Sequence, residues 1–390
     1  MKSTVKEEYG KLYSVIDELS ESYVNFLAEV CEIESPTAYK AGVDEVGYYF
    51  AKKAEEKGWK VEIVKQEFSG NVVFITMNEN APGKPISLSA HMDTVHPVGS
   101  FGSPAVRRDG DRLYGPGTLD CKGGGVVAFL AMDALERCGF KDRPVHLLLQ
   151  SDEEVSSRYS KKATINSICE KAKDSVAFLN LEGHKEGKVC IERKGIIRYA
   201  VTVNGIAAHS SICFSSGANA IIEAAHKMLK IDKYKTAEGV TCNCGTISGG
   251  TVSNTVPDKC TFEVDVRFAN YEQRAEIDKI LREIVAETTV PGCTATIEVL
   301  NERTCMKRDK KNLALLDKVN TILCDAGFPE LAANSSNGGS DAADVTEYGI
   351  PCLDSIGIEG GGLHQLGEFA YIPSLSSSAK RIAAIIQGFN

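Results

Sequence analysis

Histidine and acidic side chains stand directly after three apolar runs of the sequence. His91 and Asp93 follow the run ISLSA. Glu153 and Glu154 follow HLLLQ, and Glu182 closes VAFLNLE. Each run has the length and composition of a buried strand. Because ligands in open α/β sheets bind at the carboxyl ends of strands, we expect these side chains to meet at one edge of a sheet.

Two further candidates lie in glycine-rich segments. Asp120 belongs to GPGTLDCKGGG, just before a predicted helix, and His364 belongs to EGGGLHQ. Glycine allows the backbone to carry a side chain tightly into a site, although a helix cap is the alternative for Asp120. Two histidines and several carboxylates are a ligand set that divalent ions select, zinc foremost.

The hydrophobic pattern predicts the elements that must position these residues. Helical spacing covers 12–30, 42–57 and 123–138, and strand-like runs stand at 86–90 and 145–150. Strands that alternate with helices and are almost continuously apolar indicate an α/β fold. We expect a large catalytic domain with a mostly parallel sheet and helices on both faces.

From about residue 192 the pattern changes. IIRYAVTVNG, TCNCGTIS, CTFEVDVRF and TATIEVL have strand character, and two helices are predicted between them, over 217–229 and 271–286. This order predicts a compact ferredoxin-like α+β unit. We therefore expect a catalytic domain made of 1–191 and 304–390, with a lid and dimerisation domain, 192–303, inserted into it.

Composition restricts the class of protein. A length of 390 residues favours two domains. A net charge of −9 argues against a nucleic-acid partner, and no apolar run approaches the roughly 20 residues that span a bilayer. The amino-terminal segment lacks the apolar core of a secretory signal. With thirteen cysteines, an odd number, we expect reduced thiols and a cytoplasmic location.

Short motifs run in a fixed order along nearly the whole chain. They are HMDTV at 91–95, GPGTLDCKGG at 115–124, SDEEVSS at 151–157, the acid at 182, GIAAHSS at 205–211, GGTVSNTVPD at 249–258, DVR at 265–267, GGSDA at 338–342 and HQLGE at 364–368. The ordered set resembles the M20 metallopeptidases, a family that includes glutamate carboxypeptidases, tripeptidases, aminoacylases and succinyl-diaminopimelate desuccinylases.

The resemblance implies a centre of two divalent ions, zinc by preference, with cobalt or manganese as alternatives. His91 and Glu182 would hold one ion, Glu154 and His364 the other, and Asp120 would bridge them. For the first ion, His184 is an alternative to Glu182.

The resemblance also implies roles around the metals. Asp93 would accept the second ring N–H of His91. Glu153 would act as general base, passing a proton from the attacking water to the leaving amine. His209 would reach across a homodimer to the oxyanion in the partner's site, unless it is simply a surface histidine.

Substrate contacts follow in the same way. Arg267 and Asn254 would bind the substrate terminus, since a guanidinium suits a carboxylate; a structural salt bridge is the alternative for Arg267. Gly339, Ser340 and Asp341 would line the substrate side.

Two positions depart from the family pattern. Cys121 stands where an apolar residue such as Met is expected, and packing as an inert thiol is favoured over metal ligation. Glu182 stands where peptidases commonly carry Asp and several deacylases carry Glu.

The peptide bond between Asp120 and Cys121 is predicted to be cis, as it often is in the family.

These features predict a metal-dependent enzyme that hydrolyses a terminal amide bond of a short peptide or N-acyl amino acid. An exopeptidase of carboxypeptidase or tripeptidase type is favoured. The alternative is an aminoacylase-like N-acyl amino acid deacylase, which Glu182 supports. A non-catalytic metal-dependent binding protein is a remote alternative, because Glu153 and every ligand are present.

Overall fold

The chain divides into two compact units. The computed structural model describes residues 2–234 and 239–389. The large unit comprises Met1–Ile191, Arg308–Ser335 and Ser340–Asn390, and the small unit comprises Glu192–Lys307 and Ser336–Gly339. The small unit is therefore inserted into the chain of the large unit.

An eight-stranded sheet runs through the large unit, in the order β1-β2-β6-β3-β7-β14-β8-β13. Neighbouring strands are parallel from β6 through β3 and β7 to β14. Antiparallel pairs join β1 to β2, β2 to β6 and β14 to β8. The strands are β1 (Lys60–Val64), β2 (Val72–Met77), β3 (Ile86–His91), β6 (Val145–Gln150), β7 (Ala177–Asn180), β8 (Lys188–Arg193), β13 (Ala332–Ser336) and β14 (Cys352–Asp354).

The predicted α/β class is confirmed, and the large sheet is mixed. The parallel pairs are confined to the middle. The segment 65–71 between β1 and β2 is too short for the crossover that parallel neighbours need, so these two strands form an antiparallel hairpin.

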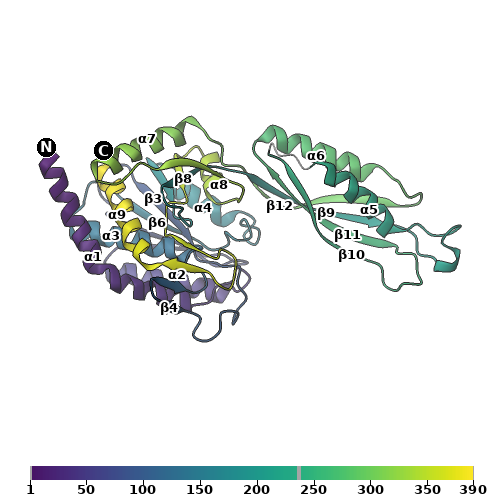
Figure 1. Cartoon of the computed structure of the whole chain (residues 1–390), viewed down its shortest axis with the longest axis horizontal. Coiled ribbons are helices and arrows are strands. Elements are labelled where there is room, and N and C mark those ends of the chain that lie inside the picture. The colour runs from purple at the N-terminus through teal and green to yellow at the C-terminus, as the bar shows by residue number, and fades with distance from the viewer. Residues whose placement is uncertain (1, 235–238, 390) are drawn as a thin grey trace. The chain divides into compact units, whose positions relative to one another are not determined.

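Helices pack against this sheet. α3 packs on α1 and α9 and also contacts β3 and β6 (Figure 1). Its sequence is apolar on nearly every side, as a helix buried all round requires. A Cβ on Gly124 would lie 2.1 Å from the carbonyl oxygen of Leu181, so only glycine lets this helix begin so close to the end of β7. The helices are α1 (Lys2–Glu32), α2 (Lys40–Glu56), α3 (Lys122–Arg137), α4 (Ala163–Ala172), α7 (Lys310–Asp325), α8 (Ala342–Glu347) and α9 (Ile372–Gly388).

A second, smaller sheet of the large unit joins the two glycine-rich segments. Its order is β15-β16-β5-β4. β16 pairs with β5 through Phe369 opposite Tyr114. The segment that carries His364 therefore lies beside the segment that leads to Asp120. The strands are β4 (Arg107–Asp109), β5 (Arg112–Tyr114), β15 (Gly360–Gly361) and β16 (Phe369–Tyr371).

The small unit has a four-stranded antiparallel sheet in the order β10-β11-β9-β12, which is the ferredoxin-like arrangement that the sequence predicted. Alternate residues of β9 and β11 are buried beneath the helices and form a separate core. The elements are β9 (Gly195–Asn204), η1 (Ser210–Ile212), α5 (Ala220–Ile231), η2 (Asp232–Tyr234), β10 (Thr241–Gly249), β11 (Lys259–Phe268), α6 (Tyr271–Ala286) and β12 (Thr294–Arg303).

Across residues 2–234 and 239–389, none of the helices is both long enough and apolar enough to span a bilayer.

Candidate metal centre

Three parallel strands deliver the candidate ligands to one edge of the large sheet. His91 is the last residue of β3 and pairs in register with Gln150, the last residue of β6. Glu153 and Glu154 follow β6, and Glu182 follows β7. β3 lies between β6 and β7, so the ends of the three strands are neighbours.

Asp120 lies at the middle of the proposed ligands, and the other four surround it. The Nε2 atom of His91 lies 2.9 Å from Oδ1 of Asp120 and 3.8 Å from Oε1 of Glu182. The Nε2 atom of His364 lies 3.1 Å from Oδ2 of Asp120 and 3.3 Å from Oε2 of Glu154. Each oxygen of Asp120 therefore faces a different histidine, which is the arrangement that a bridging carboxylate requires.

These spacings fit a pair of divalent ions. Bonds of about 2.1 Å to a tetrahedral zinc place the donor atoms of one ion roughly 3.4 Å apart. His91, Asp120 and Glu154 offer donor atoms that all lie within 4.8 Å of one another. His91, Glu182 and Cys121 form a second such group. Two imidazoles and three carboxylates are a donor set that zinc, cobalt and manganese accept.

The histidines and Asp120 shift one another's pKa values. Burial would raise the pKa of Asp120, but hydrogen bonds from His364 and His91 outweigh it and hold that pKa below its usual range. Burial would lower the pKa of His91, but its contacts with Asp120 and Asp93 and the charge of Glu182 raise it well above the usual value. Hydrogen bonds to Asp120 and Glu154 raise the pKa of His364 to about 10.

The pKa values of Glu154 and Glu182 are raised, whereas that of Asp120 is lowered. Burial raises the pKa of Glu154 to about 8, against the hydrogen bond from His364. Burial also raises the pKa of Glu182, although the charge of His91 opposes it. An ion that binds here must displace these protons, so metal affinity is coupled to pH.

The carboxylate of Asp93 binds the backbone of the acidic doublet, Glu153 and Glu154. It is fully buried. Its Oδ1 accepts the N–H of Glu153 at 3.1 Å, and its Oδ2 accepts the N–H of Glu154 at 3.1 Å and the hydroxyl of Thr37 at 2.8 Å. The Nδ1 atom of His91 lies nearer to the backbone carbonyl of Asp93, at 2.9 Å, than to its carboxylate, at 3.4 Å. The carboxylate thus orients two acids as well as one histidine.

Cys121 is fully buried beneath the centre. Its thiol donates to the carbonyl of Leu181 at 3.1 Å, and burial raises the pKa of the thiol. The peptide bond between Asp120 and Cys121 is cis, as predicted. His184 makes its contacts elsewhere: Nδ1 lies 2.9 Å from the carbonyl of Ser355, and Nε2 lies 3.9 Å from Glu359.

The structure places the predicted substrate-side residues of the large unit under the surface. Ser340 and Asp341 are 1% and 2% exposed. The hydroxyl of Ser340 donates to Asp354 at 2.6 Å, and the other oxygen of Asp354 accepts from Asn180 at 3.1 Å. Gly339 falls in the small unit, where its carbonyl accepts from Arg193 at 3.4 Å.

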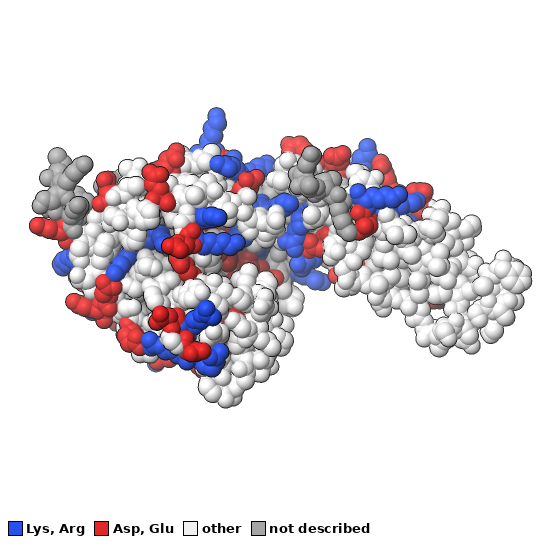
Figure 2. All heavy atoms as spheres, in the orientation of Figure 1, with Lys and Arg blue, Asp and Glu red and all other residues white. Residues whose placement is uncertain are grey.

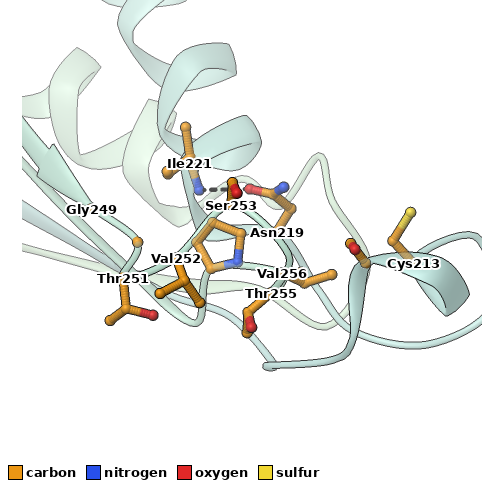
Figure 3. Close-up of a pocket in the computed structure, with 12 residues that line it drawn as sticks. Cys213, Asn219, Ile221, Gly249, Thr251, Val252, Ser253, Thr255 and Val256 are labelled. Carbon is orange, nitrogen blue, oxygen red and sulfur yellow. Dashed lines mark hydrogen bonds between the residues drawn. The ribbon is translucent and has the colours of Figure 1, made fainter.

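In the small unit, His209 and Asn254 lie together. The N–H of Ser210 donates to the carbonyl of Asn254 at 2.9 Å, and His209 forms a β-bridge with Thr255. A cavity of about 500 Å³ borders this segment (Figure 3). Asn219 lines the cavity, and its side chain accepts a hydrogen bond from the backbone N–H of Ile221 at the start of α5. The lining also includes the segment 249–253, Thr255, Val256, Pro257, Ser210 and Cys213.

Arg267 lies at the other end of this sheet. Gly249 pairs with Cys260 near the segment that holds Asn254, whereas Arg267 pairs with Ile196. Eight residues of strand separate Lys259 from Arg267, a span of roughly 26 Å. Arg267 also binds Asp265, with Nε at 2.6 Å and Nη2 at 3.2 Å. The structure therefore does not bring Arg267 together with His209 and Asn254 within one small unit.

Sequence reasoning overlooked two buried residues at the centre. His96 received no role, and Glu368 was noticed only as part of the motif HQLGE. Their ring and carboxylate meet at 2.9 Å. The only available signal was the position of each, a few residues after a proposed ligand.

Comparison with known proteins identifies similar sequences. Residues 191–293 match the family model described as the peptidase dimerisation domain, M20_dimer. Carboxypeptidase G2 from Pseudomonas sp. (strain RS-16) is 28% identical over 360 residues, covering 90% of this chain and 85% of its own length.

Two solved structures show the same fold. A tripeptidase from Staphylococcus aureus superposes with a TM-score of 0.78 at 21% identity, covering 94% of this chain and 98% of that one. A protein from Bacillus subtilis, described as a dinuclear metal-binding peptidase of the M20 family, superposes with a TM-score of 0.69 at 16% identity, covering 95% and 99%. The resemblance predicted from the motifs is confirmed: the small unit matches the dimerisation domain of the M20 peptidases, and most of the chain is similar to a carboxypeptidase in sequence and to M20 peptidases, which are enzymes, in fold.

Proposed function

We propose that the chain is a two-metal exopeptidase, most active with zinc, that removes the terminal residue from short peptides with a free carboxylate. The observation that carries this proposal is the position of Asp120, which faces His91 through one oxygen and His364 through the other. The name of the relative carboxypeptidase G2 supports the carboxypeptidase type.

Each ion would have its own ligands. His91 and Glu182 would hold one, Glu154 and His364 the other, and Asp120 both. When bound, such a pair supplies a water molecule made acidic by two charges and polarises the scissile carbonyl.

The side chains that move protons belong to the chain itself. Glu153 is buried beside Glu154, and its charge adds to burial in raising the pKa of that neighbour. One carboxylate of the doublet would grip an ion while the other takes a proton from the attacking water and delivers it to the leaving amine. Asp93 accepts hydrogen bonds from the backbone amides of both Glu153 and Glu154. It would therefore hold Glu154 in position to bind an ion and Glu153 in position to transfer a proton.

The active form would be a homodimer that associates through the small unit. The end of this unit that carries His209 has hardly any charged side chains on the face shown in Figure 2. The segments 205–222 and 243–257 contain no Lys, Arg, Asp or Glu. Exposed apolar side chains lie in both, with Phe214 at 86% exposure and Val252 at 60%. An uncharged surface with exposed apolar side chains of this kind favours a protein interface.

In such a dimer, substrate contacts would come from two chains. His209 of the partner subunit would donate to the oxyanion. Arg267 would act in its own chain: it and Arg198 both bind Asp265, so two cations face one anion and a positive charge remains to attract a carboxylate.

Two matched tripeptides test this proposal. The zinc-loaded chain should release amine from a tripeptide blocked only at its amino terminus, and a Glu153→Gln chain should not. Cleavage only of the peptide blocked at its carboxyl terminus would refute the carboxypeptidase assignment. It would point to recognition of a free amine, as in a tripeptidase or aminopeptidase.

Deacylation of N-acyl amino acids is the second candidate, because Glu182 occupies a position where several deacylases carry Glu. An N-acetyl amino acid that is hydrolysed faster than any dipeptide would favour it. A metal-dependent binding protein would bind zinc without hydrolysing either class. A cytoplasmic location fits a chain with thirteen cysteines, an odd number.

A further inference from the structure

A buried carboxylate outside the proposed ligand set connects the loops that carry the ligands. Glu368 is 1% exposed and stands four residues after His364. Its Oε1 accepts the N–H groups of Leu119 and Asp120, at 2.9 and 3.0 Å. Its Oε2 lies 2.9 Å from Nε2 of His96, which is itself 6% exposed.

These contacts join three segments that are distant in the sequence. His96 is 272 residues from Glu368 and follows the strand that ends in His91. Leu119 is 249 residues away, in the loop before α3. Glu368 itself closes the loop of His364, where its own N–H donates to Gln365 at 3.0 Å. One side chain therefore ties together the loops of three proposed ligands.

Glu368 contacts the backbone of Asp120 directly. The amide of Asp120 and the amide before it point at the same carboxylate oxygen, which fixes the course of the backbone from which the bridging side chain projects. The backbone adds a third tie, because the N–H of Gly115 donates to the carbonyl of Glu368 at 3.2 Å. Loops have no ladder of sheet hydrogen bonds to hold them, so such contacts must set their position.

A buried lysine lies among the acidic side chains of this region. Lys122 is 1% exposed, and its Nζ donates to the carbonyl of Ile33 at 2.7 Å. Burial lowers the pKa of Lys122, and the charges of neighbouring groups, Glu368 among them, oppose that change. A carboxylate away from water is tolerated only with partners of this kind.

We propose that Glu368 is a positioning residue of the metal centre. By holding the amides of Leu119 and Asp120 and the ring of His96, it sets the bridging carboxylate at the distance from His91 and His364 that two ions require. The proposal rests on the proposed function only in that Asp120 is taken as a metal ligand; it does not depend on which substrate is cut.

The test compares two buried carboxylates of the large unit. Glu368→Gln removes the charge of the side chain and keeps an accepting oxygen. Glu368→Ala removes all hydrogen bonds of the carboxylate. Asp133→Asn is the matched control: Asp133 is 2% exposed and binds Tyr23 and Arg137, at 2.8 and 3.0 Å. It lies on α3, 11 residues beyond Lys122, the first residue of the helix, and so roughly 16 Å along the helix axis. Each full-length chain is loaded with cobalt for visible absorption and with zinc for competition against a chromophoric chelator.

Glu368→Ala should weaken zinc binding by about 10- to 100-fold, the usual effect of losing a group that orients ligands, and should change the cobalt spectrum. Glu368→Gln should fall between it and the wild type, since a neutral oxygen still accepts both amides but more weakly. With a cleavable peptide, kcat should fall while KM stays within about threefold, as expected when a transition-state contact is lost. Asp133→Asn should keep the wild-type affinity and spectrum.

The proposal is overturned if folded Glu368→Ala and Glu368→Gln chains keep the wild-type zinc affinity and cobalt spectrum. It is also overturned if Asp133→Asn changes both as much, since the effect would then be a general loss of stability. If no peptide is cleaved by the wild type, the proposed function fails, yet the metal measurements still decide the role of Glu368.

Discussion

The Nε2 atom of His91 lies 2.9 Å from Oδ1 of Asp120, across 29 residues of sequence. The contact joins the end of a central strand to the loop before α3. On its other oxygen Asp120 meets His364 at 3.1 Å. Each oxygen of Asp120 thus faces a different histidine, as expected of a carboxylate that bridges two ions.

Removal of the metal should therefore abolish activity and lower stability. Chelated protein is expected to lose peptide hydrolysis and to recover it with zinc. Its unfolding temperature should fall, because an ion at 100 times its Kd contributes about 2.7 kcal/mol to the folded state. Calorimetry of chelated and zinc-loaded protein measures this difference, and a chelated chain that retains full activity would contradict the metal assignment.

The acidic doublet should separate into two functions on mutation. Glu153→Gln is expected to lower kcat by about 10²- to 10⁴-fold, the usual contribution of a general base, while zinc affinity stays near the wild-type value. Glu154→Gln is expected to weaken the binding of one ion, because a neutral amide then replaces one of its carboxylate donors. Titration with zinc and single-turnover hydrolysis distinguish the two variants. If Glu153→Gln hydrolyses peptides at the wild-type rate, the base lies elsewhere.

The convergence of the candidate ligands at one sheet edge could be predicted from the sequence because local rules govern it. Each of His91, Glu154 and Glu182 stands at or just after a strand end, and parallel neighbours bring those ends together. The mixed character of the sheet was missed, since strand-length apolar runs do not reveal direction. His96 and Glu368 were missed because their contact spans 272 residues and no local pattern encodes it.

The pairing of Arg267 could have been inferred. Asp265 and Arg267 are two positions apart in the run CTFEVDVRF, and alternate residues of a strand share a face. Their ion pair is thus a local consequence of strand geometry. The distance between Arg267 and His209 could not be inferred, because it depends on how β11 is aligned with its neighbours.

A buried histidine far from this chemistry should make stability depend on pH. Burial, together with the charge of Lys171, lowers the pKa of His146 to about 4. Its Nδ1 lies 3.4 Å from the hydroxyl of Ser87. In the unfolded chain the pKa is about 6.5, so the unfolded state binds more protons between the two values. The stabilising contribution is present above pH 6.5 and is lost as the pH falls towards 4.

His146→Gln should therefore lose less stability than the wild type on acidification. In metal-free protein, the free energy of unfolding should change differently in the two chains between pH 7 and pH 4.5, by up to about 3 kcal/mol. Urea denaturation at a series of pH values provides the comparison. Parallel pH profiles for the two chains would show that His146 does not titrate as its burial implies.

Mixed dimers should show whether His209 acts across the interface. Glu153→Gln and His209→Ala chains are each expected to be nearly inactive alone. In a dimer of one of each, the His209→Ala chain keeps its own Glu153 and receives His209 from its neighbour, so one of the two sites is complete. Random mixing in equal amounts makes half of the dimers mixed and should restore roughly a quarter of the wild-type activity.

An exposed histidine of the same unit supplies the control for this experiment. His226 lies on the outer side of α5, and His226→Ala should be fully active alone and in mixtures. If His209 acts within its own chain, mixing creates no complete site and activity stays at the level of the parents. Recovery that rises with protein concentration, as the mixed dimer forms, would identify the interface as part of the active site.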